Sequence, residues 1–130
     1  TMNQVQLIGN ITKDPEIRYT NTGKSVASFT VAVSRSYTPQ GSSEQKELTD
    51  FLPCVAWGNL AERVGNNLGK GSHVVVHGRM QVRSYETAEG QKRYVTEVVC
   101  SFVGMALKDD APKGTDFDKV GKEVDEDIPF

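Results

Sequence analysis

Residues Thr49–Glu62 read T-D-F-L-P-C-V-A-W-G-N-L-A-E, a predicted strand that changes into a helix at Gly58. Because alternate side chains of a strand point to opposite faces, Leu52, Cys54 and Ala56 can pack inward together. The other face then carries Phe51 and Trp57, two large rings six residues apart. Exposed rings in a row can stack on unpaired bases, since every base has a π-face. They can equally cover a second core or a subunit interface, and this stretch alone does not separate the two.

The length and composition favour one small domain. The chain has 130 residues, of which 37% are hydrophobic. No apolar run approaches the roughly 20 residues that a membrane-spanning helix needs. The first residues lack the basic flank and long apolar segment of a signal peptide. We therefore expect a cytoplasmic protein with no membrane partner.

The charges are divided unevenly along the chain. Residues 1–108 carry 12 Lys and Arg against 9 Asp and Glu, a balance of +3. Residues 109–130 carry 3 against 8, a balance of −5, so the net charge is −2. A mildly basic body with an acidic tail is compatible with a nucleic-acid partner, whereas an evenly acidic protein is not. The alternative is an ordinary solvated surface with a solubilising end.

The cysteines and histidines do not indicate a metal site or a cofactor. Cys54 and Cys100 lie in apolar strand-like contexts without a C-x-x-C motif, which predicts buried, reduced thiols. His73 and His77 lie in S-H-V-V-V-H-G, a β-branched run that predicts a strand. Four residues along a strand span ~13 Å, too far for two ligands of one ion.

The order of predicted elements indicates the fold. A first strand covers 5–11, with a bend at Gly9, and resumes briefly over 16–20. Further strands are predicted over 25–36, 49–57, 73–85 and 93–105, with a long loop over 38–47. A helix over 60–68, capped by Asn59 and stopped by Gly69, separates the third strand from the fourth. This order is that of the all-β OB-fold, a five-stranded Greek-key barrel with one short helix between strands 3 and 4.

Some positions within these strands carry more specific expectations. In the fourth strand Val74, Val76, Met80 and Val82 are predicted to face inward, and Ser101 and Gly104 are possible irregularities of the fifth. Pro53 donates no ladder hydrogen bond, so it needs a sheet edge or a bulge.

The last 22 residues differ from the rest of the chain. Residues 109–124 lose all periodicity, and their low hydrophobicity and mixed charge predict a disordered linker. Residues 125–130 form a separate acidic tip, in chain order Asp125, Glu126, Asp127, Ile128, Pro129 and Phe130. An apolar I-P-F ending serves solubility poorly, so the tip is a candidate for docking partners: Phe130 can fill an apolar pocket while the acids meet a basic rim.

Aromatic and basic side chains at strand positions form a candidate binding site. The predicted stacking residues are Tyr37, Phe51, Trp57 and Tyr85. The predicted phosphate contacts are Arg18, Lys70, Arg79 and Arg83, with Lys46 nearby. Stacking contributes ~1–3 kcal/mol per base, and cations follow the phosphates. A duplex hides its base faces, so this combination favours single strands.

Motifs along nearly the whole chain resemble the bacterial-type single-stranded DNA-binding proteins. The matching runs are N-x-V-x-L-I-G-N-I-T-x-D-P-E-I-R-Y at 3–19, G-K-S-V-A-S-F-T-V-A-V at 23–33, W-G-N-L-A-E at 57–62, K-G-S at 70–72, G-Q-K-R-Y-V-T-E-V-V at 90–99 and the D-E-D-I-P-F tip. The match covers residues 2–108 and the tip, and suits a chromosomal, phage, plasmid or secondary copy.

The resemblance implies roles for these residues. Tyr37, Phe51, Trp57 and Tyr85 fall where the family has its base-stacking aromatics, and Arg18, Lys70 and Arg83 fall near its DNA path. Residues 125–130 resemble the tip that recruits replication, recombination and repair proteins. Family members are usually homotetramers associated with the nucleoid. The first strand pairs across one interface, and His73, Val75 and His77 are candidates for the other.

Two other classes of function remain possible from the residues. One is an OB-fold interaction module of the primosomal accessory type, which mainly binds proteins or RNA. The other is an enzyme such as a nuclease, which needs clustered carboxylates or a base–nucleophile pair. The acids lie in turns and the tail, so we expect no enzyme.

Overall fold

Six strands and one helix make up the computed structural model, which describes residues 1–107. In chain order they are β1 (Val5–Ile11), β2 (Glu16–Tyr19), β3 (Ser25–Tyr37), β4 (Lys46–Trp57), α1 (Asn59–Asn67), β5 (His73–Glu86) and β6 (Lys92–Met105). The predicted order is confirmed, with the brief resumption of the first strand present as the separate β2. The predicted loop over 38–47 is too long, because β4 begins at Lys46 and pairs with Tyr37. The linker and the tip lie outside the described residues.

Five of the strands close into a barrel, which confirms the predicted OB-fold architecture. Neighbours in the sheet follow the order β1-β5-β6-β4-β3-β2, and β1 also pairs with β3. All pairs are antiparallel except β4–β6. Closure depends on Gly9, the predicted bend, where β1 passes from β5 to β3. A Cβ at Gly9 would collide with the carbonyl oxygen of Ala32, so only glycine allows this close approach.

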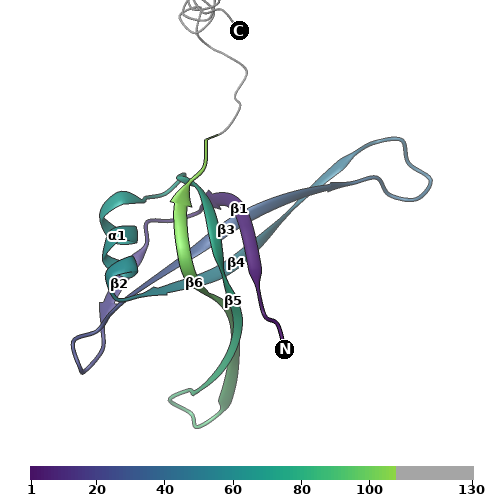
Figure 1. Ribbon diagram of the computed structural model, residues 1–130. Coiled ribbons are helices and arrows are strands. Elements are labelled where there is room, and N and C mark those ends of the chain that lie inside the picture. The colour runs from purple at the N-terminus through teal and green to yellow at the C-terminus, as the bar shows by residue number, and fades with distance from the viewer. Residues whose placement is uncertain (108–130) are drawn as a thin grey trace, which may run out of the picture.

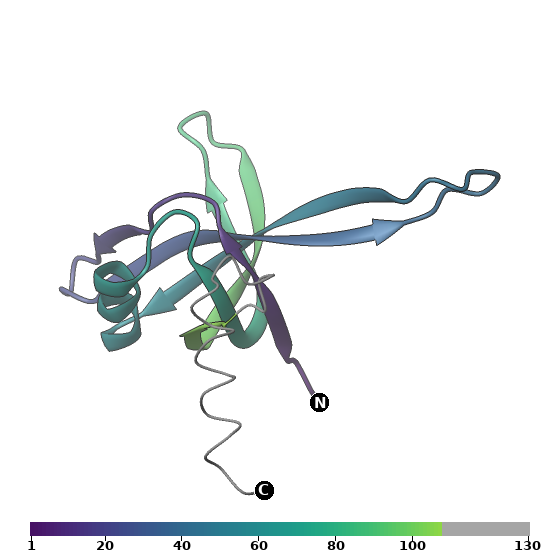
Figure 2. The same ribbon diagram turned by 90° about the horizontal axis from the view of Figure 1, so that it is seen from above.

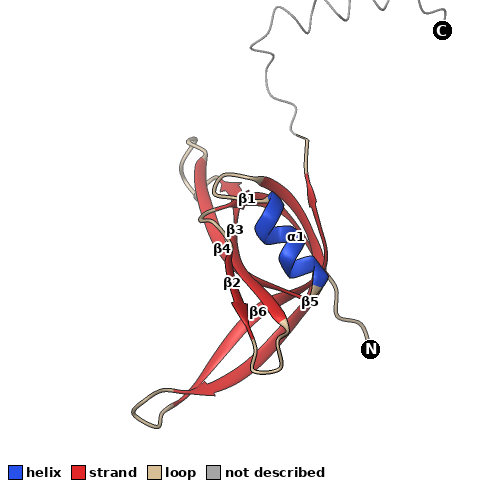
Figure 3. Cartoon of the chain, turned by 90° about the vertical axis from the view of Figure 1, so that its left-hand side faces the viewer, coloured by secondary structure: helices blue, strands red, loops and turns tan. Residues whose placement is uncertain are grey.

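The core is formed by one face of each barrel strand and by α1. The core residues are Ile11, Ala27, Phe29, Val31, Cys54, Ala56, Ala61, Val64, Val74, Val76, Val98 and Cys100. Val55, on the opposite face of β4, is also buried. Helix α1 lies against the strands of the barrel wall (Figure 3) and packs Leu60 and Val64 inward, and Leu68, the residue after the helix, continues this stripe. This stripe is the one that the apolar spacing predicts.

The strand-to-helix junction differs from the prediction. Asn59 is the first helical residue and does not cap the helix; Gly58 occupies the cap position, with a φ of 66° and no side-chain cap bond. Ser25 holds this junction, because its backbone carbonyl accepts from the Gly58 N–H at 2.9 Å and its hydroxyl donates to the Gly58 carbonyl at 3.0 Å. The helix ends at Asn67, two residues before the predicted stop at Gly69.

Two long hairpins extend beyond the barrel in different directions (Figures 1 and 2): an arm formed by β3 and β4, and an arm formed by β5 and β6. Met80 and Val82, predicted to face inward, lie on the second arm and are 39% and 65% exposed. They have the inward parity, but β5 has left the barrel by this point. The predicted irregularity at Ser101 is confirmed: the register with β5 shifts there, pairing His77 with Phe102 and Gly78 with Cys100.

Pro53 also has the predicted setting. Its partner Thr30 directs its carbonyl oxygen to the Thr12 N–H, at 3.1 Å, and hence away from β4. The nitrogen of Pro53 therefore faces the other edge of β4, where the pairing with β6 covers only Cys54 and Val55. Because that edge is unpaired at Pro53, no ladder hydrogen bond is missing.

Candidate nucleic-acid interface

The outer face of β2, β3 and β4, called here the platform, carries the two aromatics predicted first. Cross-strand register places Arg18, Val26 and Trp57 in one row, and Ala32 beside Phe51 in another. Trp57 is 42% exposed and Phe51 64% exposed. Their six-residue separation corresponds to ~20 Å along the strand. The positions between them hold Ser28, Thr30, Pro53 and Val55, whose short side chains leave the rings standing above the surface.

A groove beside the platform joins it to the β5–β6 arm. This groove has a volume of about 310 Å³, and its lining residues are Lys13, Asp14, Glu16, Ser28, Phe29, Thr30, Pro53, Cys54, Arg83, Val95 and Glu97. Arg83 thus reaches the platform from a distant part of the chain. Tyr85 is half exposed and shares the strand parity of Arg83, so this arm also contributes a ring and a cation.

Tyr37 does not lie on the platform. It is 39% exposed, as a stacking residue must be, but it shares the parity of Phe29, Val31 and Val33. That parity faces the core within the barrel and faces solvent on the β3–β4 arm. Tyr37 and Phe51 therefore lie on opposite sides of the arm. Lys46 pairs with Tyr37 across the two strands, so it lies on the same side of the β3–β4 arm as Tyr37.

The predicted cations have different settings. Arg18 lies in the row of Trp57 and pairs with Glu16, with 2.7 Å between Nη2 and Oε1. The Lys70 N–H donates to the Asp14 carboxylate at 2.8 Å, which ties the loop after α1 to the turn that lines the groove. Arg79 is not brought to the groove. It lines a separate pocket of about 270 Å³ with Asn3 and His77.

Two groove residues were missed by the sequence reasoning. Lys13 is an ordinary lysine in a turn, and no local signal distinguishes it. Glu97 had a signal: it is a carboxylate inside the apolar run V-T-E-V-V, and buried acids are rare unless paired. It is 7% exposed and accepts from Arg83 Nε at 2.7 Å and from Gln81 Nε2 at 3.2 Å.

On another side of the barrel, the outer faces of β1, β5 and β6 form what we call the back face. Ile8 pairs with Val75 and His77 with Phe102, and both Ile8 and Phe102 are more than half exposed. His77 contacts Gln6, and His73 Nδ1 lies 2.6 Å from Asn10 Oδ1. The back face therefore combines aliphatic and aromatic side chains with the two histidines and the neutral amides of Gln6 and Asn10.

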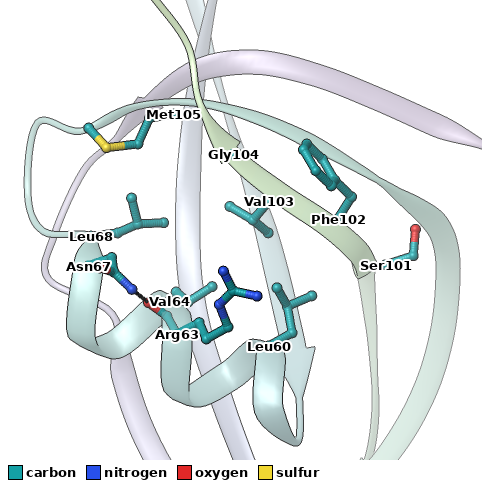
Figure 4. Close-up of a pocket in the computed structure, with 10 residues that line it drawn as sticks. All are labelled: Leu60, Arg63, Val64, Asn67, Leu68, Ser101, Phe102, Val103, Gly104 and Met105. Carbon is teal, nitrogen blue, oxygen red and sulfur yellow. Dashed lines mark hydrogen bonds between the residues drawn. The ribbon is translucent and has the colours of Figure 1, made fainter.

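A cavity of about 430 Å³ lies between α1 and β6, yet none of the predicted binding residues lines it. Figure 4 shows Leu60 and Val64 of the helix, and Leu68 directly after it, facing Val103 of the strand, with the Arg63 side chain between Val64 and Leu60. Its apolar lining continues the packing of α1 on the barrel. The candidate interface is thus a surface and a shallow groove.

The cysteines are reduced and buried, as predicted. A hydrogen bond with the Cys100 side chain and burial both raise the pKa of the Cys54 thiol. Within residues 1–107 no three His, Cys, Asp or Glu side chains gather closely enough to hold a metal ion. The same part of the chain contains no helix that is long and apolar enough to cross a membrane.

Known proteins are similar to this chain in sequence and in fold. The model of the single-strand binding protein family matches residues 2–106. Single-stranded DNA-binding protein 2 of Clostridium acetobutylicum is 44% identical over 130 residues, which are 98% of this chain and 92% of the relative. Single-stranded DNA-binding protein A of Bacillus subtilis is 50% identical over 97 residues, which are 75% of this chain and only 55% of the relative.

A solved structure of a Plasmodium falciparum SSB complex with ssDNA superposes with a TM-score of 0.74 at 27% identity. The superposition covers 82% of this chain and 97% of the other. The sequence match over nearly all of the barrel, together with this fold, shows that the chain belongs to the single-strand binding protein family.

Proposed function

We propose that this protein binds single-stranded DNA without strong sequence preference, by stacking bases on exposed aromatic rings and pairing phosphates with nearby cations. The observation that carries the proposal is the platform: Trp57 and Phe51 stand exposed on one face, in register with Arg18 and beside the groove that holds Arg83. Stacking and phosphate contacts are both tolerant of sequence. The family membership and the solved relative bound to single-stranded DNA support the same activity.

The other predicted residues extend this path. Tyr85 lies beyond Arg83 on the β5–β6 arm, and Tyr37 with Lys46 lies on the far side of the β3–β4 arm. A strand that contacts both Phe51 and Tyr37 must pass around the edge of that arm. Lys70 and Lys13 supply positive charge near the turn that closes the groove. Arg79 lies apart from this path, so we assign it the weakest role.

A fluorescence titration tests the proposal directly. Trp57 is the only tryptophan in the sequence, so its emission reports one site. Adding oligo-dT at several salt concentrations should quench this emission at nanomolar protein, and duplex DNA of equal length should not. Equal affinity for RNA, or no loss of binding on replacing Trp57 and Phe51 by alanine, would instead favour the protein- or RNA-binding module. Magnesium-dependent cleavage of the DNA would favour an enzyme.

We also propose that the protein is a homotetramer assembled through β1 and the back face. The supporting observation is the exposure of Ile8 and Phe102 on a face with few charges. Four copies would let one strand contact several platforms. Sedimentation equilibrium should give four chains per particle. Ile8→Glu should lower this number, because it places a charge in an apolar interface, while each remaining protomer should still bind a short oligo-dT.

Residues 125–130 are proposed to recruit replication, recombination and repair proteins. The support is their sequence, three acids followed by I-P-F, and the resemblance to the family tip. A variant ending at residue 124 should still bind oligo-dT and should fail to retain partner proteins. A second expectation follows from the charge of the tail. Removing residues 109–130 should tighten DNA binding at low salt, because their net charge of −5 no longer competes with the DNA for the basic side chains of the body. Unchanged affinity would contradict that competition.

A further inference from the structure

Glu97 is a buried carboxylate in a groove whose proposed ligand is an anion. Along with Ser25 it is one of two buried polar residues among residues 1–107, and the charged one of the two. It lines the groove together with Arg83, Pro53 and Thr30. An acid at this place repels phosphate and loses hydration on burial, so it needs a compensating role.

The contacts of Glu97 indicate that role. Its Oε1 atom accepts from Arg83 Nε at 2.7 Å and from Gln81 Nε2 at 3.2 Å. The side chain of Glu97 is 9% exposed, whereas that of Arg83 is 51% exposed. The arginine is therefore held from below through Nε alone. Within residues 1–107 its terminal nitrogens Nη1 and Nη2 have no hydrogen-bond partner, and these two groups form the fork that suits a phosphate.

The exposed ion pair on the same groove makes a contrast. Arg18 donates to Glu16 through both Nε and Nη2, at 3.1 and 2.7 Å. Its two side chains are 70% and 60% exposed. Water competes with such a pair and the side chains stay free to separate, so it fixes little. A buried acceptor with a second donor, Gln81, is a more rigid anchor.

We infer that Glu97 is a positioning residue for single-strand binding: by anchoring Arg83 Nε it fixes the guanidinium so that its terminal N–H groups point into the groove toward the phosphates. The inference rests on the proposed function. The negative charge of Glu97 itself opposes the ligand, so its favourable effect on binding comes through Arg83. A long arginine loses much rotamer freedom on binding, and an anchor already in place reduces that loss.

The sign of one substitution tests the inference. Glu97→Gln and Glu16→Gln each remove one acid from the same groove, so electrostatics alone predicts tighter oligo-dT binding for both. If Glu97 positions Arg83, Glu97→Gln should instead weaken binding about five- to thirtyfold. Glu16→Gln, the matched control, should bind equally or more tightly. The salt dependence of Glu97→Gln should move toward that of Arg83→Ala, and that of Glu16→Gln should not.

A double-mutant cycle separates positioning from damage to the barrel. In an Arg83→Ala background, Glu97→Gln should have no further weakening effect, because the side chain that Glu97 anchors is gone. Additive losses would mean a general structural role and would overturn the inference. Arg83→Lys provides a variant outside the core: it keeps the charge but loses the Nε contact and the fork. It should bind nearly as weakly as Arg83→Ala, and wild-type affinity for it would overturn the inference.

The outcomes also separate the inference from the proposed function. If the unmodified protein does not bind oligo-dT, both fail. If it binds, and Glu97→Gln binds as tightly as Glu16→Gln, the proposed function stands and the positioning role of Glu97 is wrong.

Discussion

The platform and the back face are two outer surfaces of one barrel, and both expose large apolar side chains. On the platform, Phe51 and Trp57 stand among serine, threonine and proline, with Arg18 in the same row. On the back face, Phe102 and Ile8 lie among valine and neutral polar residues. Exposed aromatics alone therefore do not distinguish a ligand surface from a subunit interface. The neighbouring residues do: spaced rings with cations suit a charged strand, and exposed apolar side chains among uncharged neighbours suit a second copy.

The largest expected effect is a loss of affinity for oligo-dT when the aromatic rings of the platform are removed. Replacing both Phe51 and Trp57 by alanine should weaken oligo-dT binding by about 2–6 kcal/mol, because two stacking sites are lost at ~1–3 kcal/mol each. Binding is followed by anisotropy of a labelled oligonucleotide, since the fluorescent tryptophan is gone. Tyr19→Ala is the matched control: Tyr19 is 67% exposed and adjoins Arg18, but faces the helix side. A comparable loss in the control would contradict the assignment of the platform.

The next effect concerns the strand that connects the two surfaces. Gly9 lets β1 pass from β5 on the back face to β3 under the platform. Gly9→Ala should lower the free energy of unfolding by about 2–4 kcal/mol, because the new Cβ collides with a backbone carbonyl that cannot move freely. Urea denaturation measures the loss. Gly104→Ala is the control, since its Cβ meets ring atoms of Phe102 at 3.0 Å that can rotate away. Equal losses in both variants would show that closure at Gly9 tolerates a side chain.

A smaller effect comes from the core between the two surfaces. The pKa of Cys54 is raised in the folded protein, so the folded state keeps the thiol proton at a pH where the unfolded chain releases it. This contribution is fully present below the unfolded pKa of about 8.5 and is lost as pH rises above it. One pH unit higher, this contribution of Cys54 should have fallen by ~1.4 kcal/mol; Cys100, whose pKa is lowered by its hydrogen bond with Cys54, offsets part of the fall. Cys54→Ala should remove this part of the pH dependence. A fall of the same size in Cys54→Ala would assign it to other groups.

The smallest expected effect is the change in the salt dependence of DNA binding when one cation is removed. Lys70→Ala should lower the slope of log affinity against log salt by about 0.7, the value for one phosphate contact on a single strand. Arg63→Ala, on α1 and away from the groove, should leave that slope unchanged. If the two variants gave the same slope, the loop after α1 would lie off the DNA path.

Strand parity predicted the barrel well and the arms poorly. Ala27, Phe29 and Val31 are buried as their alternation requires, and the predicted helix is present as α1, between β4 and β5. Met80 and Val82 were predicted to face inward but are exposed, for a shared reason. Parity assigns a side chain to one of two faces, but where a strand leaves the barrel neither face is covered. No sequence pattern marks that point.

The groove could be predicted only in part. The aromatics and cations were identifiable because their residue types suit a nucleic acid. The pairing of Arg83 with Glu97 was not, since it depends on a register fourteen residues apart in a hairpin. Arg79 was selected because it is charged and shares the strand parity of Arg83 and Tyr85, and the structure places it in another pocket.

The β3–β4 arm has a consequence for how this chain tolerates insertions and deletions. Beyond the barrel, the arm is a two-stranded ladder that ends at the turn after Tyr37. Adding one residue to each strand near that turn lengthens the arm and leaves the pairing of Phe29 with Cys54 unchanged. Adding one residue to β4 alone between Phe51 and Cys54 would shift the register and exchange its two faces. The reach of the arm can therefore change between relatives in symmetric steps while the barrel stays constant.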